Sequence, residues 1–291
     1  MDDNPALTIK EVGYPKYGFN DLYVTTETSL WLNATNSDYT DGVGVSHTCL
    51  WIWWDSNTDG TAETLLEQVC IPDGSWYNGS HITGDLDALV DGNISIHVQF
   101  HEEYYHEIWW YSVDYLGNNE TSLNNGSYFT QPHYVDDTPS VTTKEIGSPQ
   151  WNNGSYITSA TPIYLNTTDM GYYHAVGCDY LHWEIWWWNE TINGTDKWML
   201  IDSCAVEYDN QATLYLEKSG MNKIVYWSAD KLGNMEKKQT QIHYVDNTAP
   251  IIHKSVGDPH YNQSLPPGDY YVTSATPLAI SATDTEGISA V

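Results

Sequence analysis

Apolar and polar residues alternate with a period of two along most of the chain, in short runs rich in Val, Ile, Thr, Tyr and Trp that Gly, Pro, Asn and Asp interrupt. This pattern is typical of β-strands with one face buried. No long amphipathic helix is predicted, only a short helical turn at 85–90. Strands are expected near 7–12, 22–25, 29–34, 48–54, 64–70, 93–100, 107–113 and 128–135, and then near 141–146, 155–158, 162–167, 180–188, 197–204, 212–217, 222–229 and 238–245.

The chain repeats itself. His-Tyr-Val-Asp occurs at 133–136 and again at 243–246, with similar text after each copy, and a degenerate earlier copy matches residues 30–35 to residues 163–168. A period of about 110 residues indicates tandem domains. Seven or eight short strands per unit favour a β-sandwich. We predict a first domain at 1–136, a second at 137–247 and the opening part of a third at 248–291, either truncated or completed by another chain.

Two segments carry a family resemblance. Residues 108–118 and 224–234, which both end in Leu-Gly-Asn, resemble the last hairpin of bacterial and archaeal immunoglobulin-like surface repeats, and the linkers at 135–139 and 245–250 resemble the junctions between such repeats. The resemblance covers nearly the whole chain and implies an all-β fold of tandem immunoglobulin-like β-sandwich domains. It is less specific for function, because such modules serve S-layers, sheaths, filaments, adhesins and spacer regions of secreted enzymes.

The charge balance excludes one class of partner. The chain has 39 acidic residues against 10 basic ones, all of them lysine, and a net charge of −29. Nucleic-acid binding needs clustered Lys or Arg for the phosphates, so nucleic acid is not an expected partner. The acidic surface instead suits divalent cations. No stretch approaches the roughly 20 apolar residues of a membrane helix, so no membrane span is expected in this segment.

Cysteines and glycosylation sequons indicate an extracellular protein at the cell surface. Each full unit holds two cysteines, separated by 21 residues in the first and 26 in the second, so one disulfide per unit is predicted: Cys49 with Cys70, and Cys178 with Cys204. Ten Asn-x-Ser/Thr sequons occur where about four would arise by chance, which predicts covalent N-glycans. They begin at Asn33, Asn78, Asn93, Asn119, Asn125, Asn153, Asn166, Asn189, Asn193 and Asn262.

Calcium is the one cofactor that the sequence suggests, and none is required. Asp55, Asn57 and Asp59 place oxygen ligands at alternate positions of a loop with Gly60 sixth, as in the first half of an EF-hand, but the twelfth position is Leu66 rather than Glu. The same residues also suit an ordinary hairpin turn. At the junctions, the acids Asp136, Asp137 and Asp246 either bridge neighbouring domains through calcium or form a polar linker.

Clustered tryptophans are the unusual feature. They occur at 51–54 and 183–188, and neighbours on a strand point to opposite faces, so some must point away from the core. We predict that Trp53, Trp54, Trp186 and Trp187 pack at an interface between subunits or domains. The alternative is that they stack on a sugar ligand.

The chain offers little for catalysis. There is no Gly-rich phosphate loop and no Gly-x-Ser-x-Gly elbow, and His101 and His106 are five residues apart instead of the four that a zinc-binding helix requires. The sequence therefore predicts a non-catalytic structural glycoprotein that self-associates into an extracellular layer, sheath or filament, as in archaeal S-layers. The alternatives are an adhesin or carbohydrate-binding module and the spacer region of a larger secreted enzyme.

Overall fold

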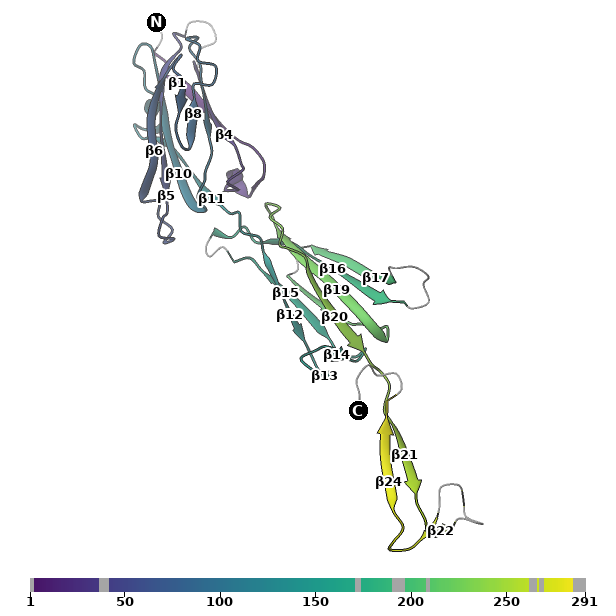
Figure 1. The fold of residues 1–291 in the computed structure, drawn as a ribbon. Coiled ribbons are helices and arrows are strands. Elements are labelled where there is room, and N and C mark those ends of the chain that lie inside the picture. The colour runs from purple at the N-terminus through teal and green to yellow at the C-terminus, as the bar shows by residue number, and fades with distance from the viewer. Residues whose placement is uncertain are drawn as a thin grey trace.

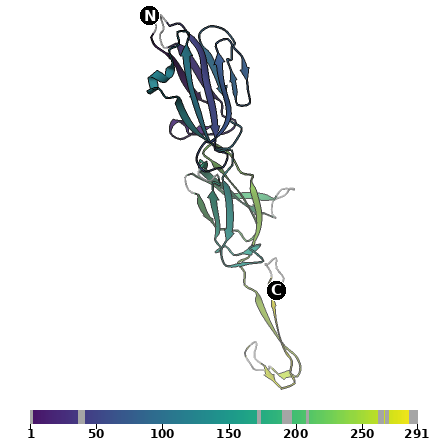
Figure 2. The same cartoon turned by 90° about the vertical axis from the view of Figure 1, so that its left-hand side faces the viewer.

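A computed structural model describes residues 3–36, 42–170, 174–189, 197–207, 210–261, 266 and 270–284. In this part of the chain the strands form three groups that follow one another along the sequence, and every strand pairing lies within a group. Both views show the groups laid end to end, from the purple N-terminal group to the yellow C-terminal one (Figures 1 and 2).

The first group is a sandwich of two sheets. One sheet has the order β1-β4-β9-β8-β7 and the other the order β2-β3-β11-β10-β5-β6. In immunoglobulin lettering these are A-B-E-D, extended by β7, and A′-G-F-C-C′, with the β3–β11 pair parallel. The strands are β1 Ala6–Val12, β2 Lys16–Tyr17, β3 Tyr23–Val24, β4 Leu30–Asn36, β5 Val45–Trp54, β6 Thr64–Pro72, β7 Tyr77–Asn78, β8 Ile82–Gly84, β9 Ile94–Val98, β10 Tyr104–Asp114 and β11 Phe129–Val135.

The second group repeats this plan. Its sheets have the orders β12-β15-β18 and β13-β14-β20-β19-β16-β17, again with one parallel pair, β14–β20. Both groups are therefore immunoglobulin-like β-sandwiches, as the sequence predicts. The strands are β12 Val141–Ile146, β13 Gln150–Trp151, β14 Tyr156–Ile157, β15 Ile163–Thr168, β16 Cys178–Trp188, β17 Trp198–Glu207, β18 Gln211–Leu214, β19 Gly220–Asp230 and β20 Gln239–Val245.

Period-two alternation places the cores. On β9, Ile94, Ile96 and Val98 are buried while the residues between them are partly exposed. On β10, Ile108 and Trp110 point inward in the same way. Burying a Val, Leu or Ile side chain contributes about 1.5–3 kcal/mol, so these inward rows hold each pair of sheets together.

The third group has strands without a covered face. Its strands are β21 Ile251–Val256, β22 His260–Tyr261, β23 Tyr271–Val272 and β24 Leu278–Thr283, in two two-stranded sheets. Leu278 on β24 is 58% exposed and Ile280 is 76% exposed. Their counterparts on β15, Ile163 and Leu165, are fully buried in the second sandwich. Among the described residues nothing covers this apolar face.

The helix prediction is wrong. Residues 85–90 contain no helix, only a bend at 86–87, and the helical segments in the described part of the chain are two short 3-10 turns, η1 Phe19–Asp21 and η2 Glu120–Asn124. A cap explains η2, because the side chain of Asn119 accepts a hydrogen bond from Thr121 N–H. No helix in the described part of the chain is both long and apolar enough to cross a membrane.

Candidate cation sites and aromatic surfaces

The predicted disulfide of the first domain is confirmed. Cys49 on β5 lies opposite Cys70 on β6, and the two sulfur atoms are bonded. On its other side Cys49 pairs with Tyr111 of β10. The bond thus links the edge strand β6 to its neighbour β5, and closing a loop of this size contributes roughly 3 kcal/mol.

The predicted disulfide of the second domain is wrong. Cys178 is buried, Cys204 is exposed, and both are free thiols. Cys204 lies opposite Trp183, five residues beyond Cys178, which puts the two cysteines about 16 Å apart along the strands, too far for a bond. The place of the first-domain disulfide is taken here by the pair His182 and Ala205, so similar spacing in the sequence did not mean an equivalent register.

Eight of the ten sequon asparagines lie in the described part of the chain, and Asn193 and Asn262 lie outside it. None of the eight is buried: four are exposed and four are partly exposed. The exposed ones are Asn78, Asn93, Asn125 and Asn153, and the partly exposed ones are Asn33, Asn119, Asn166 and Asn189. Their positions are compatible with glycans, and glycosylation itself stays a prediction.

The outward face of the first domain carries a ladder of aromatic rings. Trp51 stacks on Tyr128 with ring centroids 5.1 Å apart, and Tyr128 stacks on Tyr111 at 5.4 Å. Trp53 and Trp109 continue the ladder at 5.4 Å from each other. We call these five residues the aromatic ladder. It crosses β5 and β10 and reaches Tyr128 just before β11, so three segments of one sheet surface share it.

Trp53 and Trp54 do not share a surface. Trp54 points away from the ladder, stacks on the buried His106 at 6.5 Å and donates its indole N–H to Glu103 O. The alternation of a strand requires this, so only Trp53 of the pair belongs to the outward surface.

In the second domain, Trp186 and Trp187 are both half-buried, and each has its own contacts. The indole N–H of Trp186 donates to Glu184, and the ammonium of Lys223 lies 4.8 Å from its ring. Trp187 donates to Ser219 O. The indole N–H groups of both tryptophans thus already have hydrogen-bond partners within the second domain.

The β5–β6 loop brings three carboxylates together. Asp55, Asp59 and Glu63 each offer one oxygen, and these oxygens lie within 4.8 Å of one another. Asn57 instead accepts a hydrogen bond from Asp59 N–H. An EF-hand has a glutamate at the twelfth position of the loop, where this chain has Leu66. Here Glu63, the ninth residue of the loop, provides the third carboxylate.

His174 of the second domain lies against this loop. Its Nε2 is 3.9 Å from Oδ2 of Asp55, and its ring stacks on Tyr134 with centroids 4.8 Å apart. Burial lowers the pKa of His174, and the nearby Asp55 carboxylate opposes that shift. No sequence pattern predicts this contact, because His174 and Asp55 belong to different repeats.

A second acidic cluster lies at the junction of the first two domains, where Asp136 of the linker meets two carboxylates of the second domain. Oxygens of Asp136, Asp169 and Asp230 lie within 4.8 Å of one another, and Asp136 and Asp230 are almost completely buried. Burial, with the charges of the other two carboxylates, raises the pKa of Asp136 to about 7. Asp136 also joins the domains, because it accepts a hydrogen bond from Val176 N–H at 2.8 Å.

The other two predicted junction acids do not join this cluster. Asp137 accepts hydrogen bonds from the backbone and side chain of Thr26 in the first domain. Asp246 caps Thr248 at the next junction, and the Thr248 hydroxyl also lies 3.4 Å from Asp284. The Asp137 carboxylate therefore contacts the first domain, and the calcium prediction for Asp137 and Asp246 stays a prediction.

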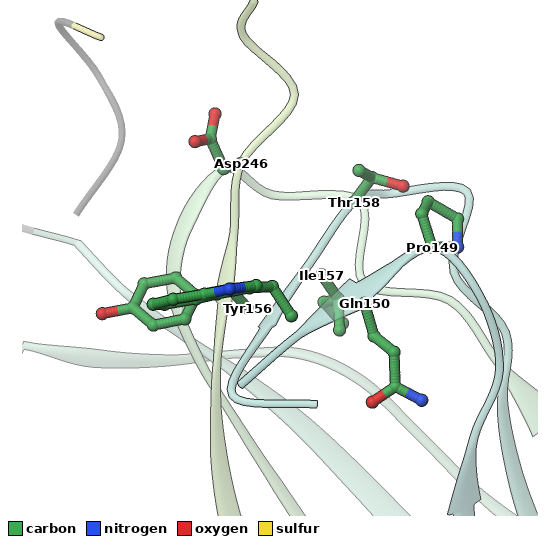
Figure 3. A pocket seen from close by; sticks show the side chains of 7 residues that line it. Pro149, Gln150, Tyr156, Ile157, Thr158 and Asp246 are labelled. Atoms are coloured by element: carbon green, nitrogen blue, oxygen red, sulfur yellow. The ribbon is translucent and has the colours of Figure 1, made fainter. Parts of the chain in front are cut away.

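A shallow depression of about 260 Å³ lies beside Asp246 at the end of the second domain. Tyr156, Ile157 and Thr158 form one wall and Pro149 and Gln150 another, with Asp246 above them (Figure 3). Trp151 is 62% exposed, and its ring packs at a tilt against that of Tyr156, with the centroids 5.2 Å apart.

The repeated His-Tyr-Val-Asp phrase has a structural basis. Its histidine is fully buried in both domains, and a lysine from the opposite sheet contacts its Nε2: Lys10 lies 2.5 Å from His133, and Lys144 lies 2.7 Å from His243. Burial lowers the pKa of His243 to about 4, and the Lys144 charge adds to the shift. The phrase therefore marks a contact between the two sheets as well as the end of a domain.

Comparisons with known proteins support only the general fold. No family model matches the chain, and no curated protein matches it. Similar solved structures include the fibronectin(III)-like modules of Clostridium thermocellum CbhA, at 10% identity over 81% of this chain and 94% of that one, with a TM-score of 0.30. The FN1–FN3 domains of chicken CNTN1 match at 9% identity over 83% of this chain and 68% of that one, with a TM-score of 0.30. Neither likeness is close enough to support an argument about function. The fold is assigned from the strand order of the two sandwiches.

Proposed function

We propose that this chain is a non-catalytic structural segment of an extracellular surface protein, whose sandwiches act as serial spacers in a layer, sheath or filament. The observation that carries the proposal is the end-to-end arrangement of two complete sandwiches across a short, well-bonded junction (Figure 1). The disulfide Cys49–Cys70 supports an oxidising location, where such bonds persist.

The junction supports a mechanical role. Asp136 accepts the Val176 N–H through its side chain and the Asn234 side-chain amide through its backbone carbonyl, at 2.8 Å each. The ammonium of Lys231 lies 5.2 Å from the ring of Tyr17 in the first domain. Several contacts therefore cross from one domain to the next, which limits the bending expected of a free linker.

Lateral association would use the aromatic ladder. Aromatic side chains are enriched at protein interfaces, and rings held in stacks lose little conformational entropy on binding. The acidic surface opposes close contact between chains at low salt. We expect assembly to become stronger as the ionic strength rises.

A second candidate function is carbohydrate binding, and the aromatic ladder is the observation that favours it. Sugar rings stack on exposed aromatic faces. Only Tyr128 of the ladder is exposed, at 43%, and the other four rings are partly covered. A broad surface of partly covered rings suits contact with another protein better than a sugar cleft.

The test is electron microscopy of the native material with light scattering of the purified chain. Trp53→Ala removes one ring from the ladder, and Trp76→Ala, at a residue 57% exposed and outside the ladder, is the control. We expect Trp53→Ala alone to weaken assembly. Discrete monomers at every salt concentration would contradict the proposal, and retention of the wild type on a glycan affinity gel, lost in Trp53→Ala, would favour the second candidate.

A further inference from the structure

The β5–β6 loop has the form of a cation-binding loop. The side chain of Asp55 is fully buried, and its two oxygens accept Asp59 N–H at 3.2 Å and Gly60 N–H at 2.6 Å. Asp59 and Glu63 are exposed, so solvent can reach the oxygens they offer. The site is therefore anchored on one side by the sandwich and open on the other.

His174 supplies an observation independent of the acids. It is 3% exposed, and neither ring nitrogen has a hydrogen-bond partner among the described residues. Leaving a buried polar group unpaired is costly, and such groups are rare. Its Nε2 faces Oδ2 of Asp55 at 3.9 Å, about 1 Å beyond hydrogen-bond length. A small contraction of the loop would give this nitrogen its partner.

We propose that residues 55–63 bind one calcium ion through Asp55, Asp59 and Glu63, and that His174 of the second domain orients Asp55 by hydrogen bonding. Ca²⁺ suits this donor set because it accepts carboxylate, amide and carbonyl oxygens in flexible geometry. Mg²⁺ requires a near-ideal octahedron, and Zn²⁺ favours nitrogen and sulfur ligands. The imidazole acts as a positioning group, as partners of metal ligands commonly do.

The site would couple cation binding to the domain junction. Asp55 N–H donates to Tyr105 O at 2.9 Å, and Tyr105 packs on Tyr134, which stacks on His174. We expect a bound ion to fix the Asp55 carboxylate, and a shift of about 1 Å would bring its Oδ2 within hydrogen-bond distance of His174 Nε2. Calcium would then add a hydrogen bond between the two domains.

The first experiment measures binding of Ca²⁺ to the full chain by calorimetry, after removal of metals, at about 0.15 M ionic strength to screen non-specific attraction. Asp59→Asn and Glu63→Gln remove carboxylate ligands at exposed positions. Glu11→Gln, at an exposed residue on β1, removes the same charge elsewhere. We expect both loop variants to lose one bound calcium ion that the wild type and Glu11→Gln retain, and Mg²⁺ to bind more weakly.

Loop variants that bind calcium as well as Glu11→Gln would overturn the site. So would a preference for Zn²⁺ over Ca²⁺, since the loop would then belong to another metal class.

The second experiment tests the coupling by hydrogen exchange. In the wild type, Ca²⁺ should slow exchange in both the loop at 55–63 and the segment at 174–177, and in Asp59→Asn it should slow neither. His174→Ala should weaken calcium binding about tenfold, and His174→Gln, which keeps a donor, should restore part of it. Slowed exchange confined to the loop, or unchanged affinity in His174→Ala, would overturn the role of His174. The thermal transition of the second domain shows whether a His174 variant is folded.

Discussion

A buried glutamate holds the two sheets of each sandwich together, and its replacement gives a sharp test of the fold. Glu120 is fully buried at the start of η2. Its carboxylate accepts the backbone N–H of Thr8 on β1 at 2.6 Å and that of Ser112 on β10 at 2.9 Å, and it also accepts the Thr8 hydroxyl at 2.8 Å. β1 and β10 belong to different sheets, so one side chain satisfies donors from both.

We expect Glu120→Gln to lower the free energy of unfolding of the first domain by about 2 kcal/mol. Glutamine has one acceptor oxygen in place of two, so one buried N–H loses its partner, at a cost of about 1–3 kcal/mol, and the charge assistance to the remaining bonds is lost. Burial raises the pKa of Glu120, which means that the folded state holds the charge at a cost that glutamine relieves. The two effects oppose each other, and the unpaired donor outweighs the relief.

Calorimetry supplies an internal control, because the second domain repeats the arrangement. Glu236 accepts the backbone N–H groups of Thr142 at 3.1 Å and Ser228 at 2.8 Å. Glu120→Gln should lower the thermal transition of the first domain by about 8 °C and leave the second unchanged, and Glu236→Gln should do the reverse. The sheet-joining role of these glutamates is refuted if a variant shifts both transitions equally. It is also refuted if a variant shifts neither transition by more than about 1 °C.

Three other predictions concern the cysteines and the buried His243. Replacing Cys49 and Cys70 together by alanine should destabilise the first domain by about 3 kcal/mol, measured by urea unfolding, and the same loss should appear on reduction of the wild type. Cys204 should react with a maleimide in the folded protein while Cys178 reacts only on unfolding, and equal rates would contradict their placement. The pKa of His243 is lowered to about 4, so the unfolded chain takes up the proton first as the pH falls below about 6.5. The second domain should therefore lose about 2–3 kcal/mol of stability between pH 7 and pH 4.5, and His243→Gln should show a smaller loss.

Much of the architecture follows from the local pattern of apolar and polar residues. Alternation of apolar and polar residues fixes which face of a strand is buried, and it does so from neighbours in the sequence alone. This is why the strands around Ile96 and Ile108 could be placed, why the repeat implied two sandwiches, and why consecutive tryptophans had to point to opposite faces. Residues without such periodicity, such as the short β2 and β13, escaped prediction.

Contacts between distant segments were decided only by the tertiary structure. Cys178 and Cys204 resemble the first pair in spacing, but the register of β16 against β17 puts them far apart, because the number of residues between two cysteines does not by itself set the register of their strands. Asp136 was identifiable as a junction acid, yet its partners Asp169, which follows β15, and Asp230, at the end of β19, meet it only when the sandwich closes. His174 meets the Asp55 loop for the same reason. The sequence by itself determined most of the strands and the β-sandwich fold of the repeats, while the partners of each charged side chain depended on how the ends of separate strands and domains come together.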